Sequence, residues 1–92
     1  MTVHRVKSWP DYFEPIFSGN RTFDLRVNDR RYHVGDVLHL MEYDDRKAVF
    51  TGREIKKTIT DLIEGIGTGC ITPMKGLSRG YVVLALQDQE RP

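Results

Sequence analysis

The sequence has 92 residues, 39% of them hydrophobic, and its 14 basic and 13 acidic side chains leave a net charge of +1. This length predicts one domain, residues 1–92, with a modest core, and the near-neutral charge argues against a strongly cationic nucleic-acid coat protein while leaving a local basic patch open. A single cysteine, Cys70, and the absence of a long apolar run predict a soluble cytoplasmic protein with no disulfide, signal peptide or membrane contact.

The first elements predicted along the chain are a short strand at residues 2–7 and a helix at about 9–18. Ser8 suits the helix N-cap, and Gly19 suits the position just past the helix end. Pro15 inside the helix removes a backbone hydrogen bond, so we expect the helix to be short or kinked.

The next predicted strand, residues 22–27, carries a dense row of polar side chains. Alternate side chains of a strand point to opposite faces. The apolar side chains share one face, which we expect to pack on the core: Phe23, Leu25 and Val27. The polar side chains share the other face: Thr22, Asp24 and Arg26. This polar row is either a binding face or a solvated one.

Three further strands are expected at residues 37–43, 50–63 and 80–87, followed by a polar tail at 88–92. Residues 53–64 are ambiguous, because their apolar spacing fits a helix while their β-branched side chains favour a strand. Together the elements predict an α+β, mostly β fold: a small, partly closed β-barrel of five to six strands with one N-terminal helix packed against it.

The segment Gly19-Asn20-Arg21-Thr22-Phe23-Asp24-Leu25-Arg26 resembles the signature of the ASCH domain family, part of the PUA-like superfamily. That signature reads Gly-x-Lys-x-x-Glu-x-Arg after a short helix, and a Val-Gly-Asp corner follows it. Val34-Gly35-Asp36 stands at the expected distance here. The chain is closer still to a small ASCH-related family of unknown function that is common in bacteria and phages. Further motifs carry this resemblance across residues 4–86: Asn28-Asp29-Arg30, Tyr43-Asp44, Thr51-Gly52-Arg53 and Gly80-Tyr81-Val82-Val83-Leu84.

The resemblance implies a PUA-like barrel, so it favours a strand at residues 53–64. It also implies a ligand cleft between the helix and the barrel, lined by the signature residues. Some small ASCH proteins are amidohydrolases that remove the acyl group from N4-acetylcytidine with a lysine and a threonine. Arg21 and Asp24 stand at those two positions here. Because an arginine stays protonated and cannot easily act as base or nucleophile, that mechanism does not carry over intact.

The candidate ligand-binding residues are the polar side chains of the signature segment and the cations near it: Lys7, Arg21, Thr22, Asp24, Arg26 and Arg30. The signature arginines would hold anionic oxygens, and Thr22 and Asp24 would hydrogen-bond the polar edge of a base. Lys7 and Arg30 would add charge for a nucleic-acid backbone. Each residue has a structural alternative, since Asp24 and Arg26 could simply form an ion pair and charged turns are commonly just solvated.

Trp9 and Tyr12 flank the predicted cleft, where aromatic rings can stack on bases. The commoner role of such a tryptophan is in the core, and we expect Trp9 to lie there. Glycines mark residues 65–76 as a loop that could close over a ligand. The histidines lack metal-ligand spacing with one another or with Cys70, so no metal or other cofactor is expected.

We therefore expect an RNA- or nucleotide-binding module that uses the helix–barrel cleft, and a monomer rather than an oligomer. One alternative is a small hydrolase that acts on a modified nucleoside such as N4-acetylcytidine, or a weak ribonuclease, with Asp24 as the catalytic base. Another alternative is a protein–protein adaptor, which requires an exposed apolar patch.

Overall fold

The computed structural model describes residues 1–65, 73–74, 77 and 80–89. The described elements are β1 (Val3–Ser8), α1 (Pro10–Phe17), β2 (Phe23–Val27), β3 (Val37–Asp44), β4 (Val49–Gly65), β5 (Pro73–Met74) and β6 (Tyr81–Asp88). Hydrogen-bonded neighbours in the sheet run in the order β1-β3-β4-β6-β2, and β5 pairs with β4. β1 and β2, which are consecutive strands in the sequence, therefore lie at opposite ends of this order.

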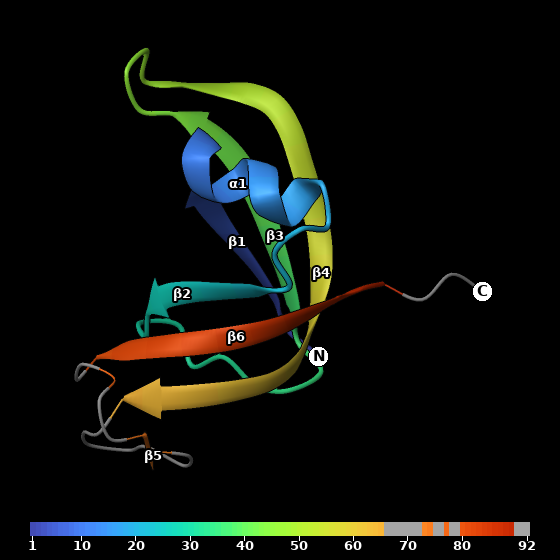
Figure 1. Ribbon diagram of the computed structural model, residues 1–92, viewed down its shortest axis with the longest axis vertical. Helices are drawn as coiled ribbons and strands as arrows, with labels where there is room; N and C mark the ends of the chain where they lie inside the picture. The colour runs from blue at the N-terminus through green and yellow to red at the C-terminus, as the bar shows by residue number, and fades with distance from the viewer. Residues whose placement is uncertain (66–72, 75–76, 78–79, 90–92) are drawn as a thin grey trace.

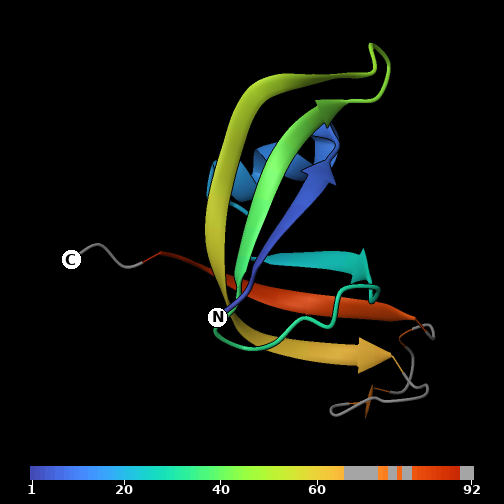
Figure 2. The same ribbon diagram turned by 180° about the vertical axis from the view of Figure 1, so that it is seen from behind.

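The sheet curls into a half-barrel, and α1 lies across β1 and β3 on its concave side (Figures 1 and 2). β1 runs parallel to β3, whereas the pairings of β4 with β3 and of β6 with β4 and β2 are antiparallel. The prediction of a mostly β, partly closed barrel with one short N-terminal helix is confirmed for the described residues. Within these residues no helix is long and apolar enough to cross a membrane.

β4 connects the two halves of the sheet, because its first half pairs with β3 and its second half with β6. Its pairing with β6 shifts register between Ile59 and Asp61. Such a bulge bends a strand and increases its twist, which lets the sheet curl at this point (Figure 1). Residues 53–64, ambiguous from periodicity, therefore lie in a strand, as the resemblance implied.

α1 begins after Trp9, whose backbone is extended, and no side chain caps its first turn. The prediction that Ser8 caps the helix is wrong, because Ser8 is the last residue of β1 and pairs with Glu42 of β3. The helix is short, eight residues, as its internal proline predicted. Gly19 follows it with φ +87°, a conformation that glycine adopts without steric cost.

The core lies between α1 and the concave face of the sheet. Its buried side chains come from the helix, from four strands and from the segment between β2 and β3: Val6, Phe13, Ile16, Tyr32, Leu38, Leu40, Ile59, Val82, Leu84 and Leu86. Phe13 and Ile16 are fully buried and attach the helix to the sheet. Trp9 is 52% exposed, so its predicted place in the core is wrong.

The two faces of β2 are the reverse of the predicted ones. Phe23, Leu25 and Val27 are 49%, 55% and 56% exposed, whereas Asp24 is only 6% exposed. The register with β6 decides this orientation, because Asp24 pairs with the fully buried Leu84 and paired residues share a face. The exposed strip of Phe23, Leu25 and Val27 is the kind of apolar patch that the adaptor hypothesis requires.

The Val-Gly-Asp corner ties the start of β1 to the start of β3. The buried Asp36 carboxylate accepts hydrogen bonds from the backbone N–H groups of Thr2 and His33, at 3.0 and 3.1 Å. Its Oδ2 also lies 2.8 Å from Nε2 of His4. Gly35 has φ +95°, where a side chain would be strained. This corner therefore positions two strands of the half-barrel.

Candidate functional site

β2 places an acidic and a basic side chain together on the concave face of the sheet. Nη1 of Arg26 donates to Oδ2 of Asp24 at 2.8 Å, and Nη2 donates to the backbone carbonyl of Lys7 at 2.9 Å. Lys7 belongs to β1, so Arg26 connects the two end strands of the half-barrel. The Asp24 side chain is 8% exposed and that of Arg26 is 21% exposed, so solvent reaches the pair mainly at the guanidinium.

The environment of Asp24 changes its acidity. Burial raises the pKa of its carboxyl group above the usual value, while the hydrogen bond and charge of Arg26 and the charge of Arg21 limit the rise. A carboxyl group with a raised pKa exchanges its proton closer to neutral pH than an exposed aspartate does. This is a property that a general base needs.

Two buried hydroxyl groups lie near this pair, and neither has a hydrogen-bond partner among the described residues. They are Ser8 Oγ and Tyr32 OH, from residues that are each 4% exposed. Ser8 directly follows the carbonyl that Arg26 binds. Burial raises the pKa of Tyr32, and Arg26 opposes that rise through its charge and through a contact with the hydroxyl that lacks hydrogen-bond geometry. We call Ser8, Asp24, Arg26 and Tyr32 the inner polar cluster.

The inner polar cluster brings hydrogen-bond donors and acceptors together in one place. Buried polar groups in proteins nearly always have partners, so two unpartnered hydroxyls beside an ion pair are unusual. A hydroxyl can both donate and accept, a carboxylate accepts, and a guanidinium donates in a fixed planar geometry. A ligand edge with both donors and acceptors would complement this set.

Sequence reasoning found only half of this cluster. Asp24 and Arg26 stand in the signature segment, but Ser8 fits a helix-cap pattern and Tyr32 lies outside every predicted element. Only the folded chain brings β1 and the segment between β2 and β3 to the concave side of β2. In the structure Ser8 continues β1 and lies opposite Glu42. Extending the predicted strand at residues 2–7 by one residue would therefore have assigned Ser8 to the strand and not to the helix cap.

Two other predicted residues lie near the start of β2. The guanidinium of Arg21 lies 5.5 Å from the centroid of the Phe23 ring, and its charge is close enough to Asp24 to limit the rise in the pKa of that carboxyl. Thr22 is exposed, and its backbone carbonyl accepts a hydrogen bond from the N–H of Leu86. Arg21 therefore lies at the edge of the inner polar cluster.

The two predicted backbone-binding cations occupy different places. Arg30 is exposed, and its charge reaches Tyr32, where it opposes the rise in pKa that burial causes. The Lys7 side chain points to the convex face of the sheet, where its Nζ lies 4.3 Å from the centroid of the Tyr43 ring. Lys7 thus contributes its carbonyl, and not its ammonium group, to the surroundings of Arg26.

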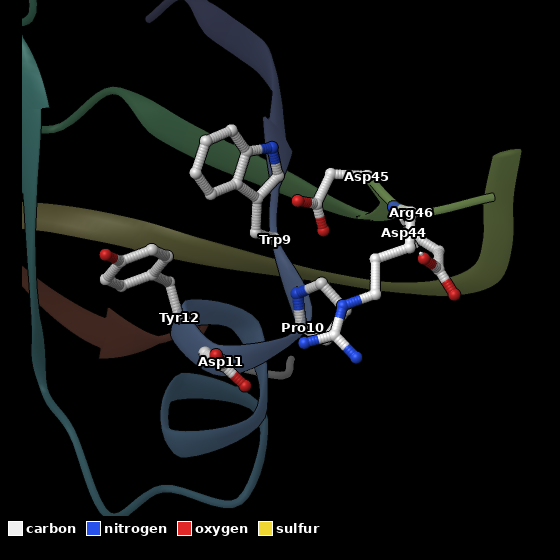
Figure 3. Close-up of a pocket in the computed structure, with 7 residues that line it drawn as sticks. All are labelled: Trp9, Pro10, Asp11, Tyr12, Asp44, Asp45 and Arg46. Atoms are coloured by element: carbon white, nitrogen blue, oxygen red, sulfur yellow. Dashed lines mark hydrogen bonds between the residues drawn. The ribbon is translucent and has the colours of Figure 1, made fainter. Parts of the chain in front are cut away.

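A pocket of about 450 Å³ opens between the start of α1 and the turn that joins β3 to β4 (Figure 3). Its lining residues are Trp9, Pro10, Asp11, Tyr12, Asp44, Asp45 and Arg46. The rings of Trp9 and Tyr12 are 6.3 Å apart, and both residues are more than half exposed. With three carboxylates and one guanidinium, this pocket suits an aromatic or cationic group better than a phosphate.

No group of three or more His, Cys, Asp and Glu side chains could hold a metal ion in the part of the chain that the structure describes. His4 pairs with Asp36, and Nε2 of His39 lies 3.2 Å from Oε1 of Glu54. Of the loop predicted at residues 65–76, residue 65 ends β4 and residues 73–74 form β5, so the loop prediction is wrong there; its other residues, Cys70 among them, lie outside the described residues.

Comparison with known protein families matches residues 3–86 to a domain of unknown function, DUF3850. A curated relative is the "Uncharacterized 12.9 kDa protein in GpA 3'region" of Escherichia phage P2, which is 37% identical over 62 residues. The alignment covers 67% of this chain and 55% of the phage protein, so the chain matches about half the length of that relative. Because the family match extends from β1 into β6, this chain belongs to the DUF3850 family.

Proposed function

We propose that this chain is an ASCH-like, PUA-like module that binds a nucleotide or a short segment of RNA at the inner polar cluster. The observation that carries this proposal is the part-buried Asp24–Arg26 pair beside the hydroxyls of Ser8 and Tyr32, which have no hydrogen-bond partner among the described residues. A nucleobase edge offers donors and acceptors in one plane and matches such a set. Arg26 remains reachable from solvent, so a ligand can approach it without unfolding the core.

The surroundings of the cluster support a nucleotide over a plain sugar or amide. Trp9 directly follows Ser8, and its exposed ring, together with that of Tyr12, provides a surface on which a base can stack. Arg21 and Arg30 supply positive charge near Asp24 and Tyr32, where a phosphate would be held. The acidic pocket at the β3–β4 turn would repel a phosphate, so the phosphate is expected on the β2 side.

The test uses Trp9 as a reporter, because it is the only tryptophan in the sequence. Titration with each of the four ribonucleoside monophosphates should change the tryptophan fluorescence, and inorganic phosphate alone should not. Asp24→Asn and Arg26→Lys should weaken binding about tenfold, because each disrupts a charge-assisted hydrogen bond of the site. Asp61→Asn, an exposed aspartate of β4, is the matched control. Unchanged affinity in both cluster variants would remove this site from the proposal.

A second candidate function is hydrolysis of a modified nucleoside, which the raised pKa of Asp24 favours. Asp24 would act as general base toward a water molecule, with Arg26 holding the oxyanion. Purified protein is incubated with N4-acetylcytidine and, separately, with single-stranded RNA, and the products are compared with those of Asp24→Asn. Product formation that depends on Asp24 supports the hydrolase, whereas turnover that survives in the variant excludes Asp24 as the base.

A further inference from the structure

The convex face of the first half of the sheet carries a row of basic side chains. The strand registers pair Arg5 of β1 with His39 of β3, and His39 with Lys56 of β4. Residues paired across neighbouring strands point to the same face, with Cβ atoms about 5 Å apart. His4 and Leu38, the neighbours of Arg5 and His39 along their strands, are buried on the concave side. The row Arg5–His39–Lys56 therefore faces away from the core and from the inner polar cluster.

Aromatic side chains continue this basic row along the same face. Nζ of Lys7 lies 4.3 Å from the ring centroid of Tyr43 and 5.8 Å from that of Phe50. The two rings pack edge to face at 5.0 Å, and Phe50 is 51% exposed. Lys7 is two residues from Arg5 on β1, so its Cα lies about 6.7 Å further along the strand than that of Arg5. A third cation and an accessible ring thus lie beside the basic row on the same surface.

The fold itself does not use the outer cations of this row. Arg26, Arg53 and Lys57 each bind a carboxylate that helps to hold the structure together. Arg5 and Lys56 are exposed, and their side chains form no ion pair or hydrogen bond with any described residue. Their charge is therefore available to a ligand.

His39 adds a buried polar group between these two cations. It is 7% exposed, and neither ring nitrogen makes a hydrogen bond among the described residues. Its Nε2 lies 3.2 Å from Oε1 of Glu54, a contact without hydrogen-bond geometry. Glu54 lies on the same face, so its negative charge partly offsets the positive charges of Arg5, Lys7 and Lys56. The local charge of the surface is positive although the whole chain is close to neutral.

We infer that this convex surface, formed by Arg5, Lys7, Lys56, Tyr43 and Phe50 around the buried His39, binds the backbone of a single-stranded nucleic acid. Arg5 and Lys56 contact successive phosphates, and Phe50 stacks on a base. A sheet face with exposed rings and flanking cations accepts single strands because unpaired bases can lie flat on it. The inference rests on the proposed function for the class of its ligand, but it places the backbone on the face opposite the inner polar cluster.

The experiment measures binding of a labelled oligouridine 12-mer and of oligothymidine of the same length by fluorescence anisotropy over a range of salt concentrations. Arg5→Gln/Lys56→Gln should weaken binding of the 12-mer about tenfold and reduce the salt slope by roughly 1.4, since each phosphate contact contributes about 0.7 on single strands. Arg31→Gln is the control, because Arg31 is also an exposed arginine and lies in the segment between β2 and β3, away from this surface. Glu54→Gln should strengthen binding, and Phe50→Leu should weaken it while keeping an apolar side chain in place.

The outcomes separate this inference from the proposed function. Loss of 12-mer binding in Arg5→Gln/Lys56→Gln, with mononucleotide binding unchanged, supports the convex surface. Equal affinity of this double variant and Arg31→Gln, or an affinity unaffected by salt, would overturn it. A wild-type protein that binds mononucleotides but no oligonucleotide also overturns it and leaves the inner site standing.

If the convex variants weaken binding of the 12-mer while Asp24→Asn binds mononucleotides normally, only the inner site fails. Equal binding of oligouridine and oligothymidine assigns the surface to the shared phosphate backbone, whereas a preference for oligouridine assigns it to RNA.

Discussion

Asp24 and Asp36 are both buried aspartates of the half-barrel, but their surroundings shift their acidity in opposite directions. Burial raises the pKa of Asp24 and outweighs the opposing charges of Arg26 and Arg21. Burial also raises the pKa of Asp36, but its hydrogen bonds from His4, Thr2 and His33 together outweigh that effect and leave the pKa below its usual value. The number of donors around each carboxylate therefore decides which protonation state the fold prefers.

This difference predicts opposite pH dependences for two matched substitutions. The folded state holds the proton of Asp24 more tightly than the unfolded state, so its ionisation costs stability as the pH rises from about 3.8 through the raised pKa. The free energy of unfolding of the wild type relative to Asp24→Asn should therefore increase on acidification. Asp36 contributes stability above about 3.8 that is lost as the pH falls through its lowered pKa, so the wild-type advantage over Asp36→Asn should decrease. Urea unfolding at several pH values measures both trends, and parallel trends would contradict the assigned environments.

Individual motif residues were easier to find than to interpret. The Val-Gly-Asp corner could be recognised from the sequence, but its aspartate anchors Thr2 and His4 instead of facing a ligand. The Thr-Gly-Arg motif likewise supplies Thr51 and Arg53, which bind the buried carboxylate of Glu42. A short motif indicates that a particular residue type is required at a position. Only the contacts of that residue in the folded protein show whether the requirement is structural or functional.

At the scale of the element, β2 separates what alternation can predict from what it cannot. The period of two correctly indicated a strand at residues 22–27, against the observed Phe23–Val27. The choice of face depended on β6, which lies more than fifty residues later in the chain and presents Val82 and Leu84 to the core. The local pattern of hydrophobic residues predicted the opposite orientation, because it contains no information about a pairing strand so distant in the sequence.

The reversed faces of β2 predict unequal costs for the same substitution on two paired strands. Leu84→Ala on β6 should lower the free energy of unfolding by about 2–5 kcal/mol, because a fully buried leucine leaves a cavity. Leu25→Ala on β2 should cost less than about 1 kcal/mol, because that side chain is 55% exposed. Chemical denaturation with an unchanged m-value checks the pair. A large loss of unfolding free energy in Leu25→Ala would mean that the exposed face of β2 is covered in solution.

At the scale of the whole molecule, charged contacts supplement the core where the helix meets the sheet. Arg53 of β4 donates to both oxygens of Glu42 at 3.0 Å and reaches Glu14 of α1 at 2.6 Å. Its guanidinium also lies 5.2 and 4.9 Å from the ring centroids of Phe13 and Phe17. The sequence could predict the helix, most of the strands and the half-barrel, although residues 53–64 were assigned to a strand only by the family resemblance. It could not predict this junction, which joins three elements through one side chain.

Removing the guanidinium should therefore loosen α1 more than it loosens the sheet. In Arg53→Met the stem of the side chain remains, but the buried Glu42 loses the cation whose hydrogen bonds hold its pKa below the usual range. We expect a lower unfolding midpoint and faster hydrogen exchange of the α1 amides than of the β6 amides, measured by mass spectrometry. Lys47→Met, an exposed residue of the β3–β4 turn, should change neither. Because protonation relieves an unpaired buried carboxylate, the deficit of Arg53→Met should shrink on acidification. A deficit that is constant with pH would assign the effect to lost ring packing instead of lost charge.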